Sequence, residues 1–116
     1  MSDDVELLRR VYALFNSRDI DSVLAAMHPD VVWANGMEGG HVHGRDAVRS
    51  YWERQWAIVD PHVEPVETSH SGEGEVSVKV HQVVHDLKGN LLADRLVTHV
   101  FQMRNGLILR FDICDL

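Results

Sequence analysis

Hydrophobic side chains recur at helical spacing in three segments of the first half of the chain. In one of them, Val48, Trp52 and Trp56 follow each other at steps of four residues. Such spacing places apolar side chains on one face of a helix that packs against a core. The pattern predicts helices over residues 3–17, 19–27 and 45–59, the second ended by His28-Pro29-Asp30. Between the second and third helices it predicts a short strand at 31–34 and a glycine-rich loop at 35–44, which leaves room for a brief hairpin.

From residue 63 onward the pattern changes to alternation. Val76, Val78 and Val80 alternate with Ser77 and Lys79, as in a strand that is buried on one side. The segments Lys88-Gly89-Asn90 and Arg104-Asn105-Gly106 are typical of hairpin turns. The second half is therefore predicted to be an antiparallel meander of strands at 63–69, 76–86, 92–103 and 107–114.

This order of elements predicts an α+β fold. Three N-terminal helices would pack on one face of a strongly curved, mainly antiparallel sheet, because strands and helices are segregated along the chain. Strands of ten or more residues must twist and curl in a small domain. We expect a cone with an internal pocket, formed by one domain over residues 1–116.

Composition narrows the functional classes. The 116 residues are 45% hydrophobic, which suits one domain with a core of its own. The net charge of −7 argues against nucleic-acid binding and against membrane binding. The single cysteine, Cys114, excludes a disulfide within the chain. The acidic start, Met1-Ser2-Asp3-Asp4, is unlike a signal peptide, so we expect a cytoplasmic protein.

Four segments in the same order resemble nuclear transport factor 2-like proteins of the SnoaL-like and ketosteroid-isomerase-like type. They are residues 10–21, 28–33, 43–48 and 105–108. The resemblance implies an α+β cone, usually dimeric, with a deep apolar pocket. Its members include steroid isomerases, polyketide cyclases, epoxide hydrolases and dehydratases, so the fold does not choose the reaction.

The isomerase residues of that family are replaced in this chain. The resemblance places the catalytic tyrosine at Val11, with Tyr12 adjacent, the aspartate base at Asn35, and the protonated aspartic acid at His99. An asparagine cannot abstract a proton from carbon near neutral pH, so the known isomerase mechanism does not carry over.

The epoxide-hydrolase pattern of the family needs an arginine and two aspartates. Arg95, Asp94 and Asp112 are candidates by residue type. Strand alternation, however, places Asp94 and Arg95 on opposite faces of the sheet.

His99 is the first candidate for a catalytic residue. It shares a strand face with Val97, Phe101 and Met103, and we assign that face to the cavity. On the last strand we assign to the cavity the face of Leu107, Leu109, Phe111 and Ile113. A buried imidazole is held neutral and can act as a general base or a substrate anchor. The alternative is a core histidine bonded to a neighbour.

Five aromatic residues are candidate walls of a substrate pocket: Trp33, Trp52, Trp56, Phe101 and Phe111. Aromatic side chains commonly line small-molecule sites, although the same spacing is expected of core packing. Asn35 is placed where the first strand leaves the sheet, at the expected mouth, as a second catalytic candidate that orients substrate. Its alternative role is a turn residue before Gly36.

The histidines do not form a compact metal-binding signature, and we predict no metal and no cofactor. His81 and His85 share a face with Lys79, which we assign to the outside unless a bulge inverts it. Asp112 is placed outside by the same register. A one-residue bulge would instead turn it toward His99 as a His–Asp pair.

Three functions fit these residues. The first is a cofactor-independent isomerase, cyclase or dehydratase that acts by acid–base chemistry on a small, largely apolar molecule with a polar end. The second is a binding protein with the same pocket and no turnover. The third is an accessory domain that forms a homodimer through the outer sheet face, where Leu96, Thr98, Val100 and Ile108 predict an apolar patch.

Overall fold

The computed structural model describes residues 2–36, 39–72 and 74–115 and confirms the predicted α+β fold. Its elements, in chain order, are α1 (Ser2–Asn16), α2 (Ile20–Ala25), β1 (Met27–Ala34), β2 (His41–His43), α3 (Arg45–Trp56), β3 (Val59–Gly72), β4 (Glu75–Asp86), β5 (Leu91–Arg104) and β6 (Leu107–Asp115). In these ranges no helix is long and apolar enough to cross a membrane.

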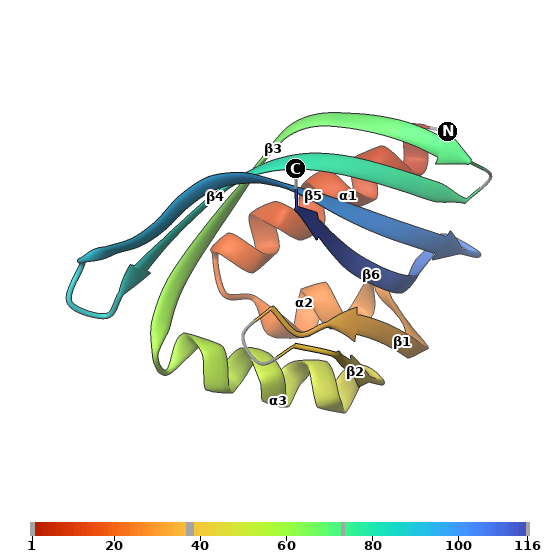
Figure 1. Cartoon of the computed structure of the whole chain (residues 1–116). Helices are drawn as coiled ribbons and strands as arrows, with labels where there is room; N and C mark the ends of the chain where they lie inside the picture. The colour runs from red at the N-terminus through yellow and green to blue at the C-terminus, as the bar shows by residue number, and fades with distance from the viewer. Residues whose placement is uncertain (1, 37–38, 73, 116) are drawn as a thin grey trace.

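The strands form one curled, unclosed sheet in the order β2-β1-β6-β5-β4-β3. Strands β3 to β6 are the predicted antiparallel meander. Strand β1 joins β6 in parallel, and β2 pairs antiparallel with β1 at the sheet edge. The helices lie on the concave side of the sheet (Figure 1). The chain therefore builds a half-open shell with an apolar interior.

Two element boundaries differ from the sequence prediction. The second helix ends at Ala25, and Met27 already belongs to β1 together with the segment that was predicted to end the helix. The third helix ends at Trp56, and β3 begins at Val59 and includes Pro61. Proline lacks the amide proton that an inner strand needs, and it is accepted here because β3 lies at the sheet edge.

One-residue irregularities in the pairing help the sheet to curl. The register shifts leave Val66 in β3, Leu92 in β5 and Leu109 in β6 without a direct partner. Such bulges bend a strand and increase its twist.

The bulge at Leu109 corrects the predicted facing of β6. Ile108 is fully buried in the core, so the prediction that it lies on the outer face is wrong. The predicted cavity positions Leu107 and Leu109 are only half-buried, whereas Phe111 and Ile113 do border the cavity. The extra residue lets Ile108 and Phe111 face the same side although they are three positions apart.

Candidate functional site

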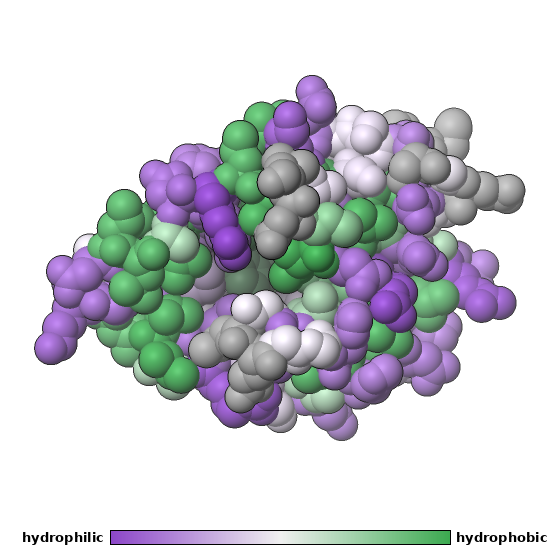
Figure 2. Space-filling view, in the orientation of Figure 1, coloured by the Kyte–Doolittle hydropathy of each residue, from purple (hydrophilic) through white to green (hydrophobic). Residues whose placement is uncertain are grey.

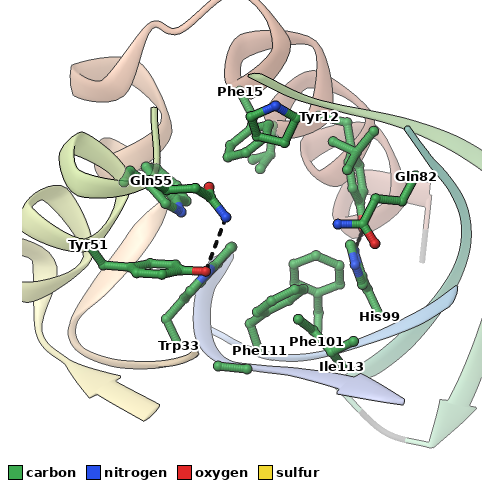
Figure 3. A pocket seen from close by; sticks show the side chains of 15 residues that line it. Tyr12, Phe15, Trp33, Tyr51, Gln55, Gln82, His99, Phe101, Phe111 and Ile113 are labelled. Atoms are coloured by element: carbon green, nitrogen blue, oxygen red, sulfur yellow. Dashed lines mark hydrogen bonds between the residues drawn. The ribbon is translucent and has the colours of Figure 1, made fainter. Parts of the chain in front are cut away.

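An apolar pocket opens between the helices and the concave face of the sheet (Figure 3). Its volume is about 80 Å³, several times the space that one water molecule needs. The lining comes from α1, β1, α3 and the four strands of the meander. We call this space the inner pocket. It is lined by Val11, Tyr12, Phe15, Trp33, Ala34, Tyr51, Trp52, Gln55, Pro61, Val63, Gln82, His99, Phe101, Phe111 and Ile113.

His99 and Tyr12 form a hydrogen-bonded pair in the wall of the inner pocket. The Tyr12 hydroxyl lies 2.7 Å from Nδ1 of His99, and both residues are buried. Strand alternation directs His99 inward, between the buried neighbours Val97 and Phe101. Tyr12 comes from α1, four residues after the buried Leu8, and thus lies on the core face of that helix.

Burial keeps both members of this pair neutral. Desolvation lowers the pKa of His99 from 6.5 to about 3, and it raises the pKa of Tyr12 well above its usual value. Among the described residues, Tyr12 is the sole hydrogen-bond partner of the His99 ring. Nε2 of His99 is therefore left for a ligand, as a donor in one tautomer and an acceptor in the other.

The aromatic walls are held by ring contacts. Trp33 and Phe111 stack with their centroids 4.0 Å apart, and Trp52 meets Trp33 edge to face at 5.3 Å. Phe111 also presents a T-shaped contact to His99 at 4.7 Å. Four of the five predicted wall residues, namely Trp33, Trp52, Phe101 and Phe111, thus line the inner pocket together with His99.

Trp56 lies behind this wall. It stacks on Trp52 at 5.7 Å, and the guanidinium of Arg18 covers its ring at 4.8 Å. Trp56 borders a separate surface hollow with Arg18 and Asp60. The structure therefore places it as a support for Trp52 rather than in the lining of the inner pocket. Its indole Nε1 is buried and has no hydrogen-bond partner in the described part of the chain.

A wider, more polar hollow adjoins the inner pocket, and we call it the mouth. Its volume is about 550 Å³, and it shares with the inner pocket Ala34, Tyr51, Gln55, Pro61, Gln82 and Ile113. Asn35 borders the mouth and is only 8% exposed. Its backbone also closes a turn, donating to the carbonyl of Gly40 and accepting from the amide of Gly39, both at 2.9 Å. Its two predicted roles are therefore compatible.

Charged residues that were predicted to lie outside the cavity pair with each other, and Asp112 does so at the border of the mouth. Asp112 accepts from Arg110 Nε at 2.7 Å and contacts His41 Nε2 at 2.8 Å, so its partner is not His99. His81 alternates with buried valines of β4 and bonds Asp94 at 2.6 Å. Among the described residues, no group of three or more potential ligands converges on a metal position.

Tyr12, Tyr51, Gln55 and Gln82 are site residues that were not among the sequence candidates. A signal existed for Tyr12, because it follows Leu8 by four residues on a predicted helix. The hydroxyl of Tyr51 accepts from Gln55 Nε2 at 3.2 Å and from the Gly36 amide at 3.0 Å. Nothing local in the sequence indicates that these contacts meet at a pocket.

The sequence model of the SnoaL-like domain matches residues 8–111, almost the whole chain. The chain belongs to the SnoaL-like domain family. A search of curated proteins gave no match.

Solved structures agree with the SnoaL-like assignment over nearly the full length. An NTF2-like protein of unknown function from Burkholderia pseudomallei is 30% identical, with a TM-score of 0.87 over 99% of this chain and 92% of that one. TerC, co-crystallised with polyporic acid, is 28% identical, with a TM-score of 0.86 over 97% and 91%. An LEH-like epoxide hydrolase from M. tuberculosis is 18% identical, with a TM-score of 0.82 over 97% and 82%, and shows the fold alone.

The SnoaL-like domain has different residues at the positions that the resemblance assigns to the isomerase. The hydroxyl of Tyr12 on α1 contacts His99, which stands at the position where the resemblance places the strand aspartic acid. Where the resemblance places two carboxyl groups, this chain has the neutral imidazole of His99 and the amide of Asn35. This SnoaL-like pocket can donate and accept hydrogen bonds, but none of the described residues of its inner lining carries a carboxylate.

Proposed function

We propose that this SnoaL-like domain binds one small, largely apolar molecule whose polar end contacts His99. One observation carries the proposal: an aromatic pocket whose wall contains the buried, neutral His99–Tyr12 pair. Removing apolar surface from water supplies affinity, and a few placed polar groups supply orientation. A neutral pair favours a carbonyl or hydroxyl oxygen at this point.

The similarity to TerC supports the same proposal. TerC was co-crystallised with polyporic acid and resembles this chain over nearly its whole length. Polyporic acid is therefore the first ligand to test, beside a panel of small aromatic and alicyclic ketones and phenols.

A second candidate function is a cofactor-independent isomerase, cyclase or dehydratase. The Tyr12–His99 hydrogen bond favours it, because Nδ1–H can donate to the tyrosine oxygen while the bare Nε2 accepts a proton from the ligand. Asn35 would orient the ligand from the mouth. The lowered pKa of His99 makes it a weak base, so the rate should show no inflection near pH 6.5.

Ligand titration monitored by tryptophan fluorescence tests the binding proposal, because Trp33 and Trp52 line the inner pocket. We expect saturable quenching in the wild-type protein. His99→Phe removes the ring nitrogens and should weaken binding of an oxygen-bearing ligand roughly ten-fold. The matched control is His81→Phe on the outer face, which should bind like the wild type.

Two results would contradict the proposal. One is no saturable binding of polyporic acid or any panel compound. The other is equal affinity of the wild type and His99→Phe for every compound that binds. Turnover of a bound compound that is lost in both His99→Gln and Asn35→Ala would favour the enzyme over the binding protein.

A further inference from the structure

Arg95 lies on the cavity face of β5, at the mouth. It is opposite Gln82 in the β4–β5 register and two residues before the inward-facing Val97. Both Arg95 and Gln82 border the mouth, and Gln82 also borders the inner pocket, whose lining includes His99 (Figure 3). A long side chain at this position can reach any ligand that extends outward from the inner pocket.

Among the residues that the structure describes, the fixed charges that border the two spaces are those of Arg95 and Asp112. Asp112 is compensated, since its hydrogen bonds to Arg110 and then to His41 lower its pKa and anchor its charge. In the described part of the chain, the side chain of Arg95 has neither an ion pair nor a hydrogen bond. Within the described ranges, the mouth therefore carries one uncompensated positive charge, in a chain whose net charge is −7.

Other arginines around the shell have structural partners. Arg18 binds Asp60 and the Pro61 carbonyl, Arg45 binds the Met27 carbonyl, and Arg49 binds Asp21. These contacts account for their positions without a ligand. No such contact among the described residues accounts for an arginine at the mouth.

We infer that Arg95 recognises an anionic group of the ligand, which makes the ligand an amphiphilic acid. Its apolar or aromatic body would occupy the inner pocket, and its carboxylate, sulfonate or similar group would meet the guanidinium at the mouth. A planar guanidinium binds such groups through two parallel hydrogen bonds. The inference rests on the proposed function, because it needs the body of the ligand to lie in the inner pocket.

Two fluorescent probes that differ by one anionic group test this inference. 8-Anilinonaphthalene-1-sulfonate carries a sulfonate, and N-phenyl-1-naphthylamine is the same aromatic body without it. We expect Arg95→Gln to lower the affinity for the sulfonate probe roughly ten-fold and to leave the affinity for the neutral probe unchanged. Added salt should weaken binding of the sulfonate probe more in the wild type than in Arg95→Gln, because salt screens the interaction between the two charges.

Two control variants separate an effect of the charge at the mouth from a general effect of charge, and test whether the probes bind in the pocket. Arg104→Gln makes the same charge change on the same strand, at the far hairpin, and should bind both probes like the wild type. Ile113 borders both the inner pocket and the mouth, so Ile113→Trp narrows the passage between them. This variant should weaken binding of both probes. Circular dichroism and thermal unfolding verify that each variant is folded.

The inference about Arg95 is overturned if Ile113→Trp weakens both probes while Arg95→Gln binds the sulfonate probe like the wild type. It is also overturned if Arg95→Gln weakens both probes equally, because that would indicate a structural role. If Ile113→Trp affects neither probe, the probes bind outside the pocket, and the result counts against the proposed function as well.

Discussion

His99 should make the protein sensitive to mild acid. Its folded pKa of about 3 lies below its unfolded value of 6.5, because burial disfavours the charged ring. The contribution of neutral His99 to the unfolding free energy is therefore complete above pH 6.5 and is lost as the pH falls toward 3. The loss attributable to His99 should approach about 1.4 kcal/mol per pH unit in that window.

Urea denaturation of the wild type and His99→Gln at about pH 7, 5.5 and 4.5 measures this dependence. Because the substitution itself changes the packing around residue 99, the comparison concerns the slope of the unfolding free energy against pH and not its absolute value. The variant should have the shallower slope. His81→Gln, at an exposed histidine, should keep the wild-type slope. Identical slopes for wild type and His99→Gln would show that His99 is not a buried neutral histidine.

At the scale of elements, the hairpin between β5 and β6 depends on two residues with positive φ. Asn105 and Gly106 have φ values of 53° and 77°, which are the positive values that a tight two-residue turn requires. Glycine adopts such values without strain, whereas a Cβ does not. Gly106→Ala should lower the unfolding free energy by about 1 kcal/mol.

Thermal unfolding of Gly106→Ala beside Gly72→Ala checks this prediction. Gly72 has no positive φ, and no atom lies within 4 Å of an added Cβ, so its substitution should be nearly neutral. Equal destabilisation by the two changes would contradict the argument from the turn. Ligand affinity should change little in Gly106→Ala, because the turn lies at the far end of the strands from the mouth.

At the scale of the whole molecule, the outer sheet face and the end of the β4–β5 hairpin expose apolar side chains. Leu96 is 49% exposed on β5, and Leu87, Leu91 and Leu92 are exposed around the hairpin end, where Figure 2 shows an apolar surface. Burying such a surface against a second copy would be favourable. We propose a homodimer that forms through the outer sheet face. Ile108 is not part of this interface, because it is buried in the core.

Sedimentation velocity of the wild type, Leu96→Glu and Ile58→Glu tests the homodimer. Ile58 is equally apolar and is exposed just after α3, away from the outer sheet face. We expect dimers for the wild type and Ile58→Glu, and monomers for Leu96→Glu. A wild-type protein that sediments as a monomer at tens of micromolar would contradict the proposal.

The sequence by itself determined the fold class and the order of the elements, and for β2 it left a brief hairpin within residues 35–44 as an open alternative. It also determined which faces of β4 and β5 are buried. These features depend on periodicity within one segment, and Val76, Val78, Val97 and Phe101 carry that signal without help from the rest of the chain. The same alternation directed His99 inward.

Only the tertiary structure decided what His99 meets and where β6 changes face. Tyr12 is 87 residues from His99, and a helix face alone does not indicate which strand it will cover. The bulge at Leu109 depends on how β6 fits against β5, so alternation misplaced Ile108. The placement of Trp56 behind Trp52, and of Arg95 at the mouth, likewise follows from packing between elements, which local patterns do not encode.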